Sequence, residues 1–124
     1  MVKDQVEGNV IELELPFPPS VNHYYRRVGP RTLISREGRA YRERVASVLA
    51  VLGIRPVRGP IHMRIEVYPP DNRRRDLDNL QKSLWDALQK GGAYLDDSQV
   101  VRFEVEKRET VAGGKVIVSI EEID

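Results

Sequence analysis

Three aspartates and a lysine are spaced so that they could serve metal-dependent chemistry. Asp76 and Asp78 lie where the chain enters a predicted helix, and Asp97 comes shortly after that helix ends. A helix leading away and a strand coming back can return Asp97 to the first two carboxylates. Converging carboxylates repel one another unless a cation sits among them, and Mg2+ prefers such oxygen ligands. A bound Mg2+ would acidify a water and neutralise charge on a phosphodiester.

Each of these residues also has a simpler interpretation. An aspartate at a helix start can be an N-cap that stabilises the helix by about 1 kcal/mol. The acids can also form surface salt bridges with the neighbouring run Arg73–Arg75. Lys82 lies one helical turn after Asp78, so it can contact a phosphate or form an i, i+4 pair with Asp78, worth about 0.2–0.5 kcal/mol. Spacing alone leaves the metal site and helix capping open.

The elements that must position these residues follow from apolar periodicity. Residues 10–15 and 61–68 alternate apolar and polar side chains, which predicts two half-buried strands. Apolar residues recur at helical spacing over residues 35–52 and 76–90. Ser35 is the expected N-cap of the first helix, and Gly53 and Gly91–Gly92 are expected to end the two helices. Asp78 with Gln81 resembles a capping box.

Residues 20–34 are predicted as a loop or short irregular strands around a Gly29–Pro30 turn. Two further strands, 100–107 and 115–123, are predicted to pair as a hairpin. Val101, Phe103 and Val105 are expected to face the core. Trp85 is expected to be partly buried, against the sheet or a subunit partner, and His62 to be structural.

The predicted fold is therefore α+β: a single domain with a small mixed sheet in the order β-α-β-α-β-β and helices packed on it. Residues 1–8 are expected to be a loose leader, with no apolar signal segment, and residues 9–124 the domain. The chain has no cysteine, which excludes disulfides, a thiol nucleophile and thiolate zinc sites. It has no apolar run long enough for a membrane helix. These features fit a cytoplasmic protein with no membrane partner.

The charge is unevenly distributed along a chain whose formal net charge is only +1. Residues 23–44 contain seven arginines and two glutamates, and Arg73–Arg75 forms a second cluster. Basic residues interleaved with aromatic ones, as in 23–27, are typical of nucleic-acid surfaces. The alternative is that one tyrosine packs in the core and the arginines are solvated. His23 is a possible general base, although an ordinary hydrogen-bonding role is more common for such a residue.

Several of these segments together resemble the RusA family of Holliday-junction resolvases, from about residue 11 to residue 122. The most specific matches are the run RRRDLDNLQK at residues 73–82 and the run LDD-x-QVV at residues 95–101. Supporting matches are Pro18–Ser20 with Asn22, Tyr24–Arg26, Ser35, Glu37–Gly38, Tyr41–Arg42 and Asp86–Leu88.

The resemblance implies a homodimeric endonuclease that binds four-way DNA junctions and needs Mg2+, with Mn2+ as a substitute. It implies paired, symmetric cuts in two opposed strands, in DNA recombination and repair. The implied essential residues are Asp76, Asp78, Asp97 and Lys82, with the three acids as metal ligands and Asp96 as a weaker candidate. A nucleoid-associated location and a phage or prophage origin are compatible with the family. The DNA contacts expected on the basic segments are Tyr24, Arg26, Arg27, Arg31, Arg73, Arg74 and Arg75.

Two alternatives remain at this point. In the first, the protein is a non-catalytic nucleic-acid-binding module whose acids only cap a helix. In the second, the same metal site cuts flaps or other branched DNA. Metal dependence would separate the first from a resolvase, and a comparison of junction, flap and duplex substrates would separate the second.

Overall fold

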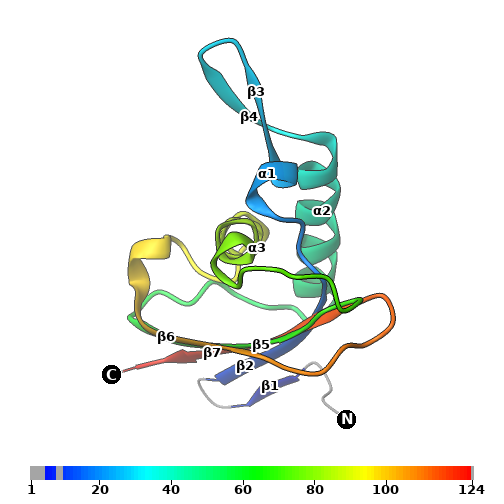
Figure 1. Ribbon diagram of the computed structural model, residues 1–124. Coiled ribbons are helices and arrows are strands. Elements are labelled where there is room, and N and C mark those ends of the chain that lie inside the picture. Colours follow the sequence, from blue (N-terminus) through cyan, green and yellow to red (C-terminus); the bar gives the residue numbers. More distant parts are fainter. Residues whose placement is uncertain (1–4, 8–9, 124) are drawn as a thin grey trace.

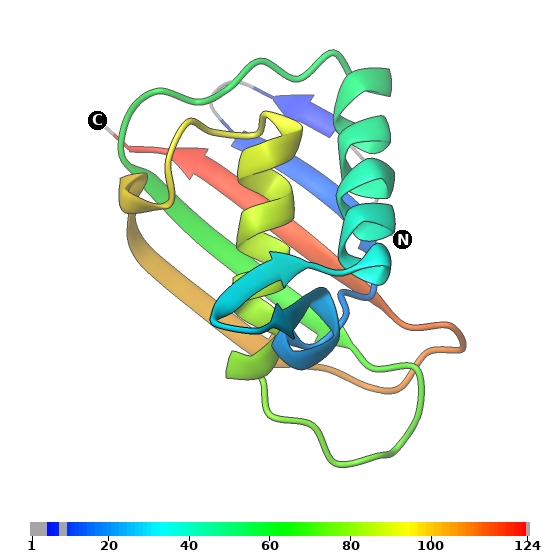
Figure 2. The ribbon, with the colours of Figure 1, turned by 90° about the horizontal axis from the view of Figure 1, so that it is seen from above.

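A mixed sheet with two long helices on one face forms the body of the protein (Figures 1 and 2). The structure is a computed structural model that describes residues 5–7 and 10–123. The strands of the sheet are, in spatial order, β1 (Gln5–Glu7), β2 (Val10–Pro16), β7 (Lys115–Glu122), β5 (Ile61–Tyr68) and β6 (Val100–Lys107). Helices α2 (Arg36–Val51) and α3 (Asp78–Gly91) cover this sheet. The α+β class and the mixed sheet are confirmed.

The two predicted half-buried strands form with the predicted faces. In β2, Ile11, Leu13 and Leu15 are buried toward the helices. The same face of β5 buries Ile61, Met63, Ile65 and Val67. The opposite face of the sheet is charged, and His62 Nε2 contacts Glu104 there at 2.6 Å. Alternation therefore identified the core side correctly.

The predicted hairpin of the last two strands is wrong, because β5 lies between them. Strand β6 is parallel to β5, and β7 is antiparallel to β5 on its other side. The connection at residues 108–114 crosses the end of β5, where Arg108 N donates to Val67 O and Val111 N donates to Pro69 O. Strand β5, helix α3 and strand β6 thus form a β-α-β unit.

Strand β6 consequently lies at an edge of the sheet, which overturns the burial expected for its apolar residues. Val101 is 65% exposed and Phe103 39% exposed, although Val105 is half-buried. Phe103 contacts Trp85 of α3 edge-to-face, with ring centroids 5.0 Å apart. The predicted partial burial of Trp85 against the sheet is therefore confirmed.

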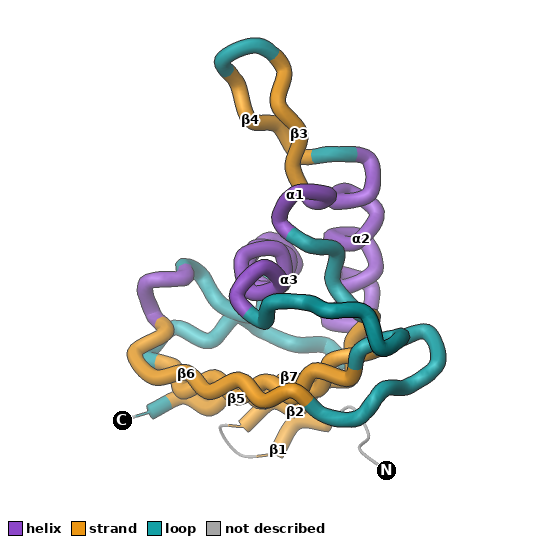
Figure 3. The backbone as a smooth tube through the Cα atoms, in the orientation of Figure 1, coloured by secondary structure: helices purple, strands orange, loops and turns teal. Residues whose placement is uncertain are grey.

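The predicted element order is incomplete: β1, the short helix at residues 21–24 and the 3-10 turn at residues 97–99 were not predicted, whereas the short strands expected within residues 20–34 do form. Within the expected leader, residues 5–7 form β1 and pair with β2, whereas residues 1–4 and 8 lie outside the described residues. Residues 20–34 form helix α1 (Val21–Tyr24) and the strands β3 (Tyr25–Val28) and β4 (Arg31–Ile34). The β3–β4 hairpin projects beyond the helical layer (Figures 1 and 3). Its turn contains Gly29, whose φ is 60°.

The helix ends follow the sequence signals with one exception. Ser35 Oγ accepts from Gly38 N at 2.9 Å as predicted, and Gly92 closes α3 with a φ of 95°. The capping box of Asp78 and Gln81 is wrong, because α3 begins at Asp78 itself and its N-cap, Leu77, makes no side-chain bond. A capping box forms instead before the 3-10 turn η1 (Asp97–Gln99), between Asp96 and Gln99. None of the helices in the described part combines the length and the apolar character needed to cross a bilayer.

Candidate active site

The β5–α3–β6 unit carries all four residues that the sequence analysis placed in the site. Asp76 ends the loop that leads from β5 into α3, Asp78 is the first residue of α3, and Lys82 lies one turn later; all three are exposed. Asp97 opens η1, just before β6, and is half-buried. A single crossover connection therefore holds every member of the predicted constellation.

The structure does not bring the three predicted ligands together as one group. Asp97 N donates to the Gln89 side chain, and the Tyr94 hydroxyl that binds Asp97 also donates to Trp85 O. Asp97 thus lies beside the later turns of α3, whereas Asp76 and Asp78 lie at its start. Within the described ranges, no three acidic or histidine side chains are close enough to share an ion.

Asp97 nevertheless has the environment of a carboxylate that would benefit from a cation. Burial raises its pKa, and the charges of Asp86 and Asp96 raise it further, although the 2.8 Å hydrogen bond from Tyr94 acts in the opposite direction. Such an ionised group is repelled by its neighbours, and a cation would relieve that repulsion. Oxygen donors of this kind suit Mg2+ or Mn2+ in their chemistry.

The adjacent acid Asp96 has a structural task instead. Its carboxylate accepts from Ser98 N at 2.8 Å, and this bond to the Ser98 backbone lowers its pKa. The same residue's N–H donates to Gln99 Oε1 at 2.8 Å, which completes the capping box. The carboxylate of Asp96 therefore serves as the N-cap of η1.

Lys82 is oriented by an aromatic ring rather than by an acid. Its ammonium nitrogen lies 5.5 Å from the centroid of the Tyr25 ring, a cation–π contact. Among the described residues Lys82 takes part in no ion pair, so the alternative pairing with Asp78 is not formed. The ammonium group is exposed and remains able to approach a phosphate oxygen.

A part-buried cluster behind this face was missed by the sequence analysis. The Tyr24 hydroxyl donates to Asp86 Oδ2 at 2.5 Å, and the Arg42 guanidinium contacts the same oxygen at 2.7 and 2.8 Å. Asp86 falls on the stripe of α3 that also carries Asp78 and Lys82, at intervals of four residues. That stripe was the available signal for Asp86, while nothing local indicates Arg42 as its partner.

This cluster corrects the expected DNA contact at Tyr24. The side chain is fully buried, with 0% exposure, and burial together with the Asp86 bond raises the pKa of its hydroxyl. The backbone of Tyr24 also packs closely on α2, since a Cβ at Gly38 would lie 2.3 Å from the Tyr24 carbonyl oxygen. Tyr24 is thus the tyrosine that packs in the core, and Tyr25 is the one beside Lys82.

The predicted DNA-contacting arginines fall into two exposed groups and one anchored residue. Arg26, Arg27 and Arg31 are exposed on the β3–β4 hairpin, and Arg73 and Arg74 on the loop before α3. Arg75 is half-buried, bonds Asp71 at 2.7 Å, and lies 5.5 Å from the centroid of the Phe17 ring. This pairing lowers the pKa of Asp71 to about 2. The arginine run thus pairs with Asp71 rather than with Asp76 or Asp78.

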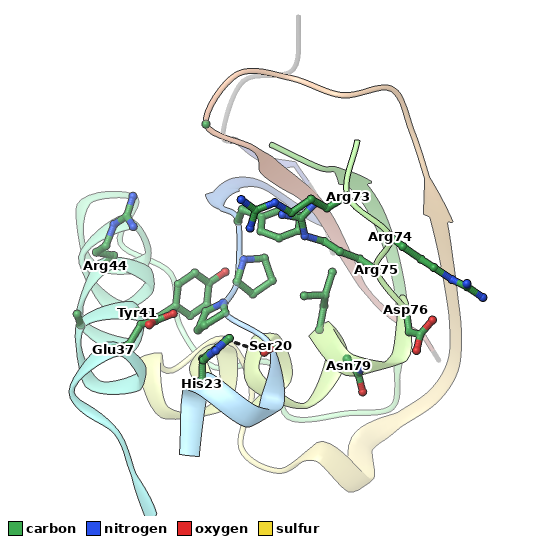
Figure 4. Close-up of a pocket in the computed structure, with 16 residues that line it drawn as sticks. Ser20, His23, Glu37, Tyr41, Arg44, Arg73, Arg74, Arg75, Asp76 and Asn79 are labelled. Atoms are coloured by element: carbon green, nitrogen blue, oxygen red, sulfur yellow. Dashed lines mark hydrogen bonds between the residues drawn. The ribbon is translucent and has the colours of Figure 1, made fainter. Parts of the chain in front are cut away.

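An open groove of about 740 Å³ adjoins Asp76 (Figure 4). Its walls are the loop before α3, the first half of α2 and the Pro-rich segment after β2. His23 also lines it and contacts Ser20, with 3.0 Å between Nδ1 and Oγ. The groove places a basic, aromatic surface next to one of the four predicted site residues.

Comparison with known proteins shows which family the sequence matches. The family described as "Endodeoxyribonuclease RusA" matches residues 16–121. A protein of Escherichia coli strain K12 named "Crossover junction endodeoxyribonuclease RusA" is 48% identical over 117 residues, which cover 93% of this chain and 97% of that protein. Proteins of the same name from Enterobacteria phage 82 and Shigella sonnei match with the same identity and coverage.

Proposed function

The chain belongs to the RusA family of endodeoxyribonucleases, and from this membership we propose that it resolves Holliday junctions by cutting two opposed strands symmetrically. The observation that carries the proposal is the 48% identity over nearly the whole length of relatives named for junction cleavage. The same chain exposes Asp76, Asp78 and Lys82 beside one helix. The reaction is hydrolysis of a phosphodiester, in the service of DNA recombination and repair.

Asp76, Asp78 and Asp97 are proposed to hold Mg2+, for which Mn2+ can substitute. Since no three acidic side chains among the described residues lie within reach of one ion, this ligand set rests on the family's residue pattern and not on the positions of the side chains. When bound, the ion would acidify a water and offset negative charge on the phosphate. The residues of the chain have defined tasks around it. Asp76 and Asp78 supply exposed carboxylates that no cap bond occupies, and Asp97 supplies one held by Tyr94. Lys82 directs its ammonium at a phosphate oxygen and stabilises charge that develops there.

The arginines of the hairpin and of the loop before α3 are proposed to contact the DNA backbone. Arg26, Arg27 and Arg31 stand on a projecting two-stranded ribbon, and Arg73 and Arg74 lie beside Asp76. Phosphate contacts of this kind set affinity and register without reading bases. Because junction DNA is the substrate, the protein would work in the cytoplasm at the nucleoid.

A homodimer is proposed because a four-way junction offers two equivalent cut points, and a two-fold pair supplies one site to each. Edge strand β6 supports this arrangement. It exposes Val101 and Phe103 beside the half-buried Trp85, whose buried Nε1 lacks a hydrogen-bond partner among the described residues. A second copy seated there would cover apolar surface that is otherwise in water.

Cleavage of synthetic DNA tests the function. We expect the purified protein with Mg2+ or Mn2+ to cut a four-way junction at symmetric positions, leaving ends that a ligase seals, and to leave flap and duplex DNA largely intact. Asp78→Asn should lose at least about 100-fold in cleavage rate while still binding the junction. Glu43→Gln, which changes an exposed acid on α2, is the matched control.

The outcomes separate the alternatives. Absence of cleavage with both metals, together with unchanged behaviour of Asp78→Asn, would contradict the proposal. Metal-independent binding without cutting would favour a non-catalytic module, although Asp76 and Asp78 do not supply the side-chain cap bond that this alternative requires. Faster cutting of flaps than of junctions would favour a nuclease of other branched DNA.

A further inference from the structure

The groove beside Asp76 joins two segments that are far apart in the sequence. Pro18, Pro19 and Ser20 follow β2, whereas Arg73 to Asp76 precede α3, and both segments line the same cavity together with residues of α2. Both are among the runs on which the family resemblance depends. Helix capping does not require these two segments to face one another across an open groove.

The floor of the groove is flat and apolar. Pro18 is buried, and Tyr41 and Leu80 are each only 3% exposed. The Tyr41 hydroxyl donates to Pro16 O at 2.8 Å, so Tyr41 lines the groove without an unpaired polar group. Because Pro18 and Tyr41 are buried, the rings that present a face to the groove are those of the half-buried Phe17 and Pro19. Stacking of a nucleobase on such rings tolerates any base.

The walls of the groove are basic. Figure 4 shows Arg44 of α2 and Arg73 at the same end of the cavity on opposing walls, whereas Arg74 and Asp76 point away along its other side. Arg75 lies beneath this end, fixed by Asp71. Four arginines line the groove with two acids, Glu37 and Asp76, and Asp71 behind it pairs with Arg73 and Arg75. The excess charge is therefore a single positive charge. A phosphate between Arg44 and Arg73 would balance that charge.

Polar side chains able to read a base lie at the opposite end. His23 and Ser20 contact each other there, and Asn79 lies nearby on the rim (Figure 4). Imidazole, hydroxyl and amide groups supply both donors and acceptors. The volume of about 740 Å³ is within the range of pockets that bind small molecules. The groove therefore has room for one nucleotide, with a basic end for its phosphate and a polar end for its base.

We propose that this groove holds one unpaired nucleotide of the strand that is cut, next to the cleaved phosphate. Its phosphate lies between Arg44 and Arg73, its base stacks over Phe17 and Pro19, and His23 contacts the edge of the base. This inference rests on the proposed function and adds to it a source of junction selectivity. Unstacking a base is unfavourable in duplex DNA and less so at a branch point, where stacking is already interrupted.

A fluorescent base analogue tests the inference without relying on cleavage. 2-Aminopurine is placed in turn at each position flanking the cut in a four-way junction, and the protein is added in EDTA, with binding followed separately by anisotropy. We expect its fluorescence to rise by about twofold or more at one position, as for a base removed from the stack. Unchanged fluorescence at every position, under saturating binding, would overturn the inference.

Three exposed-residue variants locate the effect. Arg44→Ala should weaken junction binding about 5- to 10-fold and lower the salt dependence by about one phosphate contact. His23→Ala should leave junction affinity unchanged but reduce the difference in affinity among the four bases placed at the fluorescent position. Arg55→Ala, an exposed arginine beyond the far end of α2, should behave as the parent protein. Equal behaviour of all three variants would also overturn the inference.

The fluorescence test of the groove and the cleavage test of the proposed function can fail independently. Junction cleavage with no fluorescence change anywhere would leave the nuclease intact and remove the nucleotide groove. A fluorescence rise that Arg44→Ala weakens, in a protein that never cleaves, would support the groove and contradict the cleavage.

Discussion

The Tyr24 hydroxyl donates a 2.5 Å hydrogen bond to Asp86, and this bond fixes the base of the arginine-bearing hairpin to the helix that carries Lys82. Tyr25, the next residue, lies against Lys82 and stacks edge-to-face on Tyr24 with 4.9 Å between ring centroids. Arg42 of α2 contacts both Tyr24 and Asp86, so this cluster connects α1, α2 and α3. The surface that would contact DNA is therefore attached to the candidate active site through a part-buried cluster of side chains.

Tyr24→Phe should destabilise the protein without weakening its DNA contacts. The variant removes a part-buried hydrogen bond to a charged acceptor, a change that typically costs about 1.5–3 kcal/mol. Because the ring is fully buried, junction affinity measured below the unfolding transition should be unchanged. Urea unfolding measures the loss of stability, and junction titration measures the affinity. Tyr25→Phe is the control, and a loss of affinity in Tyr24→Phe alone would restore Tyr24 as a DNA contact.

Asp97→Asn should lower the cleavage rate without lowering the stability of the protein at pH 7. Burial and the nearby acids raise the pKa of Asp97, so the folded protein binds its proton more strongly than the unfolded chain does. The stabilising effect of this proton is present at low pH and is lost as pH rises through the raised pKa. At pH 7 without metal, the variant should therefore be at least as stable as the parent, while junction cleavage falls about 100-fold or more.

Chemical unfolding in EDTA across pH 3–8 measures the stability difference. It should grow in favour of the variant as pH rises above the ordinary range of aspartate and then become constant. A variant that is less stable at pH 7 than at pH 3, relative to the parent, would show that the Tyr94 bond outweighs burial.

The hairpin arginines should govern the salt dependence of binding. If Arg26, Arg27 and Arg31 each contact a phosphate, replacing any one by alanine should lower the slope of log affinity against log salt by about 0.9. Junction titrations between 50 and 200 mM salt provide the measurement. Arg55→Ala is again the matched control, and slopes indistinguishable from it would show that the hairpin stays clear of the DNA backbone.

Asp71→Asn should loosen the loop before α3 in a pH-dependent way. The bond from Arg75, followed by the Arg73 backbone N–H, holds the pKa of Asp71 at about 2. The stabilisation is therefore present above the ordinary aspartate pKa and is lost as pH falls through about 2. Urea unfolding should show the parent more stable than Asp71→Asn at pH 5, with the two converging at pH 2. A constant difference would exclude the Arg75 pair as its origin.

Phe103→Lys should dissociate the proposed dimer. A charge on the apolar edge of β6 would have to be buried by a second copy seated there, which is costly. Sedimentation should show a monomer at concentrations where the parent is dimeric, with unfolding little changed because Phe103 is already 39% exposed. Val51→Lys, at an 86% exposed position on α2, is the control. Identical sedimentation of both variants would place the dimer contact elsewhere.

The spacing of apolar residues predicted the helices and strands that bury one face and expose the other. Strands β2 and β5 and helices α2 and α3 each bury one face, so their apolar spacing was informative. Strand order was not predictable in this way, because alternation in β6 does not reveal whether a neighbour covers it. The connection 108–114 resembles a hairpin turn in composition but is held across the end of β5 by backbone bonds.

The candidate site was predicted where residue types were distinctive along the chain. Asp76, Asp78 and Lys82 occupy one short run, and all three are exposed, Asp76 just before α3 and the other two on it. The roles of Tyr24 and Tyr25 could not be separated, since adjacent identical residues differ only in which one the short helix α1 turns inward. Asp86 and Arg42 were missed because their pairing is between two helices and depends on how those helices pack.

The position of β7 has a consequence for how the protein is made. This strand pairs with β2 on one side and β5 on the other, although it is the last strand of the described sequence. Until residues 115–122 have emerged from the ribosome, β2 and β5 have no common neighbour and the central sheet cannot close. The many long-range pairings also favour slow folding. The nascent chain would therefore carry its aspartates and arginines in an unassembled state, which defers nuclease activity until synthesis has passed the final strand.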